Sequence, residues 1–135
     1  SQALLDTLGP LAEGVVAFRE GAPTEKLPGG KYFLAEYAKQ GYKEPPEAYG
    51  AFAFTAMSLI LDTIEKVGPN RKKVRNALNK VSGSNAADSI TGKVAFDDHG
   101  QNTIAVITKY VAQDGKWTVW EDSEYASGKR KLKGM

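Results

Sequence analysis

The sequence predicts an α/β fold, in which a short strand precedes about three helices and three strands follow them. Two observations predict this order. Apolar residues recur three and four positions apart between residues 31 and 81, and from residue 92 they form short runs that end at turn residues. Glycine and proline clusters separate the segments. With 135 residues, 41% of them hydrophobic, the chain suffices for one core.

The first thirty residues contain one predicted strand. Leu4, Leu5 and Leu8 form an apolar pattern that stops at Gly9-Pro10, as a helix end or a loop would. Because this pattern begins without an initiator methionine or a leader, it suggests the tail of a longer chain. Residues 14–18 form a β-branched and aromatic run typical of a buried strand, and residues 19–30 are rich in glycine and proline, which predicts a loop.

Two helices are predicted next. Phe33, Leu34 and Tyr37 define an amphipathic helix from Lys31 to Gly41. Pro45-Pro46 suit the first turn of a second helix, which Gly68-Pro69 would end. Because its stretch from residue 49 to residue 61 is apolar nearly all round, we expect this helix to be covered on most sides.

A third helix is expected to begin after Asn70, whose side chain suits an N-cap. Val74, Leu78 and Val81 form its apolar stripe. The opposite face is basic, and we interpret it as an ordinary solvated face, with a phosphate-binding face as the alternative. Its residues are Arg71, Lys72, Lys73, Arg75 and Lys80.

The remaining chain predicts strands. Residues 82–90 are polar and small, which predicts a loop, and strands are expected over residues 92–97, 103–111 and 116–121. Asp114-Gly115 is a hairpin signal between the last two.

No residue pattern indicates catalysis, a cofactor or a metal site. The chain has no cysteine, and its one histidine, His99, stands between Asp98 and Gly100 in a predicted turn. Asp97, Asp98 and His99 are consecutive, so their side chains point in different directions and do not form a ligand set. Phosphate-binding glycine motifs are absent as well. We therefore expect a protein that is not an enzyme.

The charge distribution argues against a nucleic-acid-binding surface on the chain outside its C-terminal residues. The net charge is +2, and four cations lie near the C-terminus, so the rest of the chain carries 2 − 4 = −2. We expect this cluster, formed by Lys129, Arg130, Lys131 and Lys133, to be a solvated tail.

The longest charge-free apolar stretch has 13 residues, from 49 to 61, which is short of the roughly 20 that a membrane span needs.

Two groups of motifs follow one another along the chain: Phe33, Tyr37, Gly41, Tyr42, Pro46, Tyr49 and Phe54, and later Gly92, Val94, Phe96, Asp97 and Gly100. The order of these motifs resembles the C-terminal part of the type I periplasmic binding proteins, the substrate-binding components of branched-chain amino-acid ABC transporters. The likeness runs from Leu8 to about Trp120, and its individual motifs are loose while their order is specific. One departure is Phe54-Thr55-Ala56, where the family usually has Tyr-Asp-Ala.

This resemblance implies a fragment of a two-lobed, Venus-flytrap fold. It assigns residues 1–18 to the end of the second lobe and a crossover strand, and residues 19–90 to helices of the first lobe. Residues 91–135 would form the return crossover and the closing strands of the second lobe, with the basic tail. Family members are roughly two to three times longer, so most of both lobes would lie outside these residues.

The resemblance also implies a function. Tyr49 matches the family position where an aromatic ring lines the cleft and packs on the ligand, although it could instead be a core aromatic. Phe18 and Arg19 are weaker candidates for the cleft rim or hinge. The intact protein would bind an amino acid or related carboxylate between closing lobes and dock on an ABC-transporter permease. Its location would be periplasmic, or extracellular and membrane-anchored.

Two alternatives stay open. The chain could be a stand-alone α+β interaction module that acts as a homodimer, with its apolar helix buried by a partner. It could also be the ligand-sensing domain of a receptor. In each case exposed strand edges and an apolar helix predict that the fragment self-associates.

Overall fold

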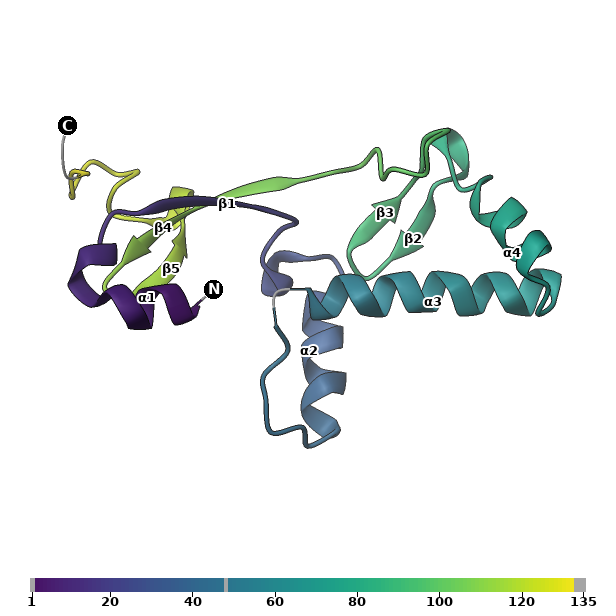
Figure 1. Cartoon of the computed structure of the whole chain (residues 1–135), viewed down its shortest axis with the longest axis horizontal. Helices are drawn as coiled ribbons and strands as arrows, with labels where there is room; N and C mark the ends of the chain where they lie inside the picture. The colour runs from purple at the N-terminus through teal and green to yellow at the C-terminus, as the bar shows by residue number, and fades with distance from the viewer. Residues whose placement is uncertain (1, 48, 133–135) are drawn as a thin grey trace. The chain divides into compact units, whose positions relative to one another are not determined.

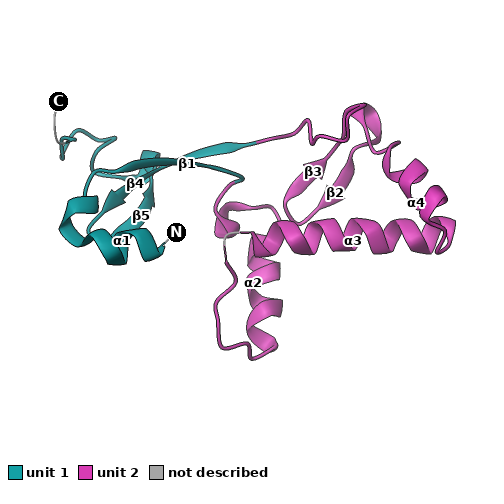
Figure 2. Ribbon diagram, viewed as in Figure 1, with its two compact units in different colours: residues 1–21, 106–135 teal, residues 22–105 magenta. Residues whose placement is uncertain are grey.

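The computed structural model describes residues 2–47 and 49–132. The chain divides into two compact units (Figure 2). Unit 1 combines residues 1–21 with residues 106–135, and unit 2 holds residues 22–105. The assignment of residues 1–18, 19–90 and 91–135 to lobes stays a prediction.

Unit 1 is an antiparallel sheet with a helix on it (Figure 1). The strands β1 (Val16–Glu20), β4 (Ile107–Gln113) and β5 (Lys116–Val119) lie in the order β1-β4-β5. The helix α1 (Gln2–Leu8) adds Leu5 to a core with Ala112, against which Trp117 packs. The predicted strands are confirmed, with β1 extending two residues beyond Phe18 and β4 beginning at Ile107 instead of Thr103. The apolar opening pattern is helical, which makes α1 a fourth α-helix.

The hairpin between β4 and β5 confirms the Asp-Gly signal. Asp114 and Gly115 have φ angles of 54° and 75°, and both occupy the left-handed region that a type I′ turn requires. The turn leaves Gln113 opposite Lys116 in the ladder. The register between β4 and β5 is therefore set by the two turn residues, Asp114 and Gly115.

Unit 2 contains three helices and a small hairpin (Figure 1). They are α2 (Gly30–Lys39), α3 (Gly50–Val67) and α4 (Arg71–Leu78), followed by β2 (Ala87–Ser89) and β3 (Gly92–Val94). Leu27, Phe33 and Ala51 form the core between the start of α2 and the start of α3. Asn70 caps α4 as predicted, because its side chain accepts a hydrogen bond from the N–H of Lys73.

Two predictions about unit 2 are wrong. The second helix begins at Gly50 and not at Pro45-Pro46, because a residue that precedes proline is biased away from the helical region. Residues 82–90 are not all loop, since residues 87–89 form β2. This polar strand is held by its pairing with β3, which its own residues do not reveal, and an exposed ion pair between Asp88 and Lys93 joins the two strands.

The coverage expected for α3 is only partial. Ala51, Thr55 and Thr63 are buried, and the helix ends at Gly68 with φ 80°, as predicted. The opposite side is apolar and exposed in the described chain, with exposed fractions of 57% at Met57 and 56% at Leu61.

Gly30→Ala is expected to destabilise the protein by about 1–3 kcal/mol, although glycine to alanine ordinarily stabilises a helix. A Cβ atom at this position would lie 1.7 Å from the carbonyl oxygen of Thr24, which is backbone and cannot turn aside. Denaturant unfolding measures the effect, with Lys31→Ala on the exposed side of the same turn as the control. A Gly30→Ala protein as stable as the parent would contradict this packing.

Candidate functional site

Tyr49, the predicted ligand contact, lies at the N-cap of α3. Its carbonyl oxygen accepts the N–H of Ala53 at 2.9 Å, which is the first hydrogen bond of the helix. Its side chain is 52% exposed and does not cap the helix. The ring therefore stands at the positive end of the helix dipole, where an anion is favoured. Its role in binding stays a prediction.

An aromatic cluster lies beside this helix end. The ring of Phe33 is 5.9 Å from that of Tyr37 and 5.8 Å from that of Phe54, and the rings of Tyr37 and Tyr42 are 5.0 Å apart. The Tyr37 hydroxyl donates to the carbonyl oxygen of Glu44, which ties the segment before α3 to α2. The structure thus brings together four aromatic residues of the sequence motif. They surround the start of α3 with apolar surface.

Gly50 allows this close packing. A Cβ atom at Gly50 would lie 3.3 Å from the Phe33 ring. A larger side chain at position 50 would press on the Phe33 ring, which lies at the centre of the aromatic cluster. Close packing therefore explains why a glycine follows Tyr49.

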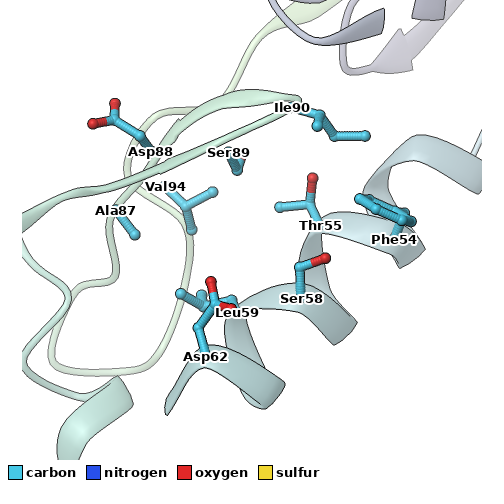
Figure 3. A pocket seen from close by; sticks show the side chains of 10 residues that line it. All are labelled: Phe54, Thr55, Ser58, Leu59, Asp62, Ala87, Asp88, Ser89, Ile90 and Val94. Carbon is cyan, nitrogen blue, oxygen red and sulfur yellow. The ribbon is translucent and has the colours of Figure 1, made fainter. Parts of the chain in front are cut away.

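A small cavity opens between α3 and the β2–β3 hairpin (Figure 3). Its volume is about 130 Å³, and the hydroxyl-bearing residues Thr55, Ser58 and Ser89 are among those that line it. The Thr55 hydroxyl donates to that of Thr91 at 3.3 Å, and the hydroxyl groups of Thr91 and Ser89 are 2.9 Å apart. The lining residues are Phe54, Thr55, Ser58, Leu59, Asp62, Ala87, Asp88, Ser89, Ile90 and Val94.

This cavity is too small to be a complete ligand pocket, since such pockets typically measure about 300–1,000 Å³. Phe54 belongs both to its lining and to the aromatic cluster. Unit 2 therefore supplies one apolar wall near Tyr49 and a helix end, and this cavity alone does not enclose a ligand.

The weaker candidates lie in unit 1. Phe18 and Arg19 are in β1; the Phe18 ring is exposed, and an Arg19 Nη2 N–H donates to the Tyr110 hydroxyl at 2.9 Å. Their part in a cleft rim or hinge stays a prediction.

The Asp97-Asp98-His99 segment forms a turn, as predicted. One carboxylate oxygen of Asp97 accepts the N–H groups of His99 at 2.9 Å and Gln101 at 2.8 Å. The carboxylate is thus engaged by its own turn. No group of three or more acidic, histidine or cysteine side chains suited to a metal ion is present among residues 2–47 and 49–132.

Arg130 is not part of a solvated tail, so that prediction is wrong for this residue. Its guanidinium group pairs with the carboxylates of Glu13 at 2.6 Å, Asp114 at 2.9 Å and Glu124 at 2.9 Å. The Tyr125 hydroxyl donates to Glu13 at 2.6 Å. Lys129 and Lys131 are exposed, and Lys133 lies outside the described residues.

These contacts shift three pKa values. Burial raises the pKa of Tyr125, and its hydrogen bond to the Glu13 carboxylate adds to the rise. Hydrogen bonds to Asp114 and Glu13 raise the pKa of Arg130 above its ordinary range. Burial alone would raise the pKa of Glu13, but hydrogen bonds from Tyr125 and Arg130 outweigh it, and the pKa is lowered.

Acid is expected to destabilise unit 1 through Glu13. Because its pKa is lower in the folded state, the carboxylate stabilises the fold above its ordinary pKa of about 4.5, and this contribution disappears as the pH falls through the folded pKa. Tryptophan fluorescence reports this unit, since both tryptophans, Trp117 and Trp120, lie in it. Unfolding curves at a series of pH values should show a shallower acid decline for Glu13→Gln than for the parent. Equal declines would contradict this account.

The chain belongs to the periplasmic binding protein family, whose sequence model matches residues 1–116. A leucine-binding protein from Thermotoga maritima MSB8 is similar in structure, with a TM-score of 0.70 and 22% identity over 88% of this chain and 33% of its own. A substrate-binding protein of an ABC transporter from Desulfitobacterium hafniense, in complex with Leu, has a TM-score of 0.59 and 19% identity over 80% of this chain and 31% of its own. No curated protein matches the sequence.

A solute-binding protein of an ABC transporter from R. palustris, in complex with benzoate, is also similar, with a TM-score of 0.62 and 16% identity over 86% of this chain and 31% of its own. The chain thus spans about a third of the length of these proteins. The resemblance to this family and the predicted fold, a fragment of its two-lobed architecture, are confirmed. Within the described residues, no helix combines the length and the apolar character needed to cross a membrane.

Proposed function

We propose that the chain is the C-terminal part of a binding protein that captures an amino acid or a related carboxylate and delivers it to an ABC transporter. The family match over residues 1–116 carries this proposal. Similar structures hold Leu and benzoate, two ligands that combine a carboxylate with an apolar group. The binding protein itself would carry out no chemical reaction.

The start of α3 suits such a ligand. The Tyr49 ring supplies a flat apolar wall with a polar tip, and the adjoining helix end favours a carboxylate. The chain passes between units 1 and 2 twice, at residues 21–22 and 105–106. We propose that these passages are hinge segments of the intact protein, which closes on the ligand and then docks on a permease. The intact protein would lie in the periplasm, or outside the cell in a membrane-anchored form.

Tyr49→Ala is expected to weaken ligand binding by the full-length protein about two- to tenfold, with the larger loss for an aromatic ligand, because a pair of aromatic rings contributes about 0.5–1.5 kcal/mol beyond its buried area. Titration calorimetry with leucine and with benzoate measures this change. Tyr32→Ala, which removes another exposed tyrosine, should leave affinity unchanged. Equal affinity of the parent and Tyr49→Ala would remove Tyr49 from the site without disproving ligand binding itself.

One observation favours a second candidate, a homodimeric interaction module. The apolar side of α3 exposes Phe54, Met57 and Leu61 in the described chain, and a second copy could cover it. Light scattering distinguishes the two: a dimer that Met57→Glu dissociates supports the module, and a cooperative monomer counts against self-association.

A further inference from the structure

We propose that the outer face of α4 binds the phosphate headgroups of an anionic lipid bilayer. Residues 66–87 contain six cations and no aspartate or glutamate, whereas the other residues carry a net charge of 2 − 6 = −4. Five of the six form one segment, here called the basic face: Arg71, Lys72, Lys73, Arg75 and Lys80. The positive charge is thus concentrated in α4, which holds four of these cations, and at Lys80, two residues beyond its end.

All five residues of the basic face are exposed in the described chain, whereas Val74 and Leu78 of α4 are partly buried and α4 contacts α3. Ion pairs occur elsewhere in the described chain, as between Lys39 and Glu36, but no residue of the basic face takes part in one. These cations are therefore available to an external anion.

The arrangement is unfavourable for the helix itself. Arg71, Lys72 and Lys73 occupy the first turn of α4, where the helix dipole repels positive charge. Arg71 and Arg75 are four residues apart and repel each other. A cluster that opposes local stability without an internal partner is typical of a functional surface.

The chemistry of the segment favours lipid headgroups over a protein or a nucleic acid. Protein interfaces depend on aromatic and apolar anchors, and single-stranded nucleic acids stack on aromatic rings. No aromatic residue occurs in residues 66–87. A hollow beside the helix is lined by Lys73, Asn76 and Lys80 together with Val67 and Ala77, so it offers ammonium and amide donors to a phosphate oxygen.

Vesicle sedimentation tests the proposal. The parent should bind vesicles of phosphatidylglycerol mixed with phosphatidylcholine, and this binding should weaken as salt rises. Lys72→Gln, Lys73→Gln and Arg75→Gln combined should reduce the partition coefficient roughly 100-fold, or about fivefold for each cation. Because the triple variant loses repulsion, its Tm should equal or exceed that of the parent, so a failure to fold will not imitate a loss of binding.

A matched control removes the same charge elsewhere. Lys31→Gln, Lys43→Gln and Lys131→Gln combined, all at exposed positions, should leave most vesicle binding in place. Three results would overturn the proposal: equal binding to pure phosphatidylcholine, equal losses in both triple variants, or binding to polyglutamate without binding to vesicles. Full displacement by millimolar inorganic phosphate would identify a site for a soluble anion and would overturn it as well. Ligand titration is a separate readout, so failure here leaves the proposed transport function untouched.

Discussion

Phe33→Ala is expected to lower the free energy of unfolding of unit 2 by about 3–5 kcal/mol, the cost of truncating a buried aromatic side chain. Phe33 is only 6% exposed and packs with Leu27 and Ala51 in the core of the unit. Its ring also contacts those of Tyr37 and Phe54. Phe33→Ala would therefore open a cavity in the core and remove the central ring of the aromatic cluster beside Tyr49.

Two optical signals allow the effect to be assigned to one unit. The helices α2, α3 and α4 lie in unit 2, so far-UV circular dichroism follows mainly that unit, while tryptophan fluorescence follows unit 1. Phe33→Ala should shift the first signal far more than the second. Tyr32→Ala, at an exposed position of the same helix, should stay within about 0.5 kcal/mol of the parent. Similar losses for both variants would contradict the assigned core.

Arg130→Met is expected to produce the largest loss of stability in unit 1. The substitution keeps the aliphatic stem but leaves Glu13, Asp114 and Glu124 facing one another without their counterion. Arg130→Lys should restore only part of the stability, because an ammonium group lacks the planar fork that reaches several carboxylates at once. Lys131→Met, at the exposed neighbouring position, should be nearly neutral.

Thermal unfolding followed by tryptophan fluorescence measures this effect. The double variant Glu13→Gln with Arg130→Met should lose less than the sum of the two single variants, because the first change removes one of the carboxylates that the second leaves unpaired. Strict additivity, or an Arg130→Met protein with the Tm of the parent, would show that the ion pairs do not hold the C-terminal segment in place.

Elements that depend on nearby residues were predictable from the sequence. The helix over α2, the cap at Asn70, the stop at Gly68 and the turn at Asp114-Gly115 each follow from residues a few positions apart. The strand β2 was missed because its polar residues depend on pairing with β3. The order of aromatic motifs, and not any single motif, correctly indicated the family.

The role of Arg130 could not be predicted, because its partners come from positions 13, 114 and 124 and meet only in the folded unit. A run of cations beside it suggested solvent exposure, and this holds for Lys129 and Lys131. Tyr49 is different: the motif identifies it as a ligand contact, and the structure has it half exposed at the N-cap of α3. Its role as a ligand contact stays a prediction.

Titration calorimetry tests the central claim, that the intact protein binds a carboxylate ligand, most directly. The protein is isolated from its own cells and titrated first with leucine and benzoate, and then with other amino acids and aromatic acids. The account predicts saturable one-site binding of at least one of these carboxylates, a matching rise in Tm, and a weaker response in Tyr49→Ala. No heat and no rise in Tm with any of them at millimolar concentration would contradict it.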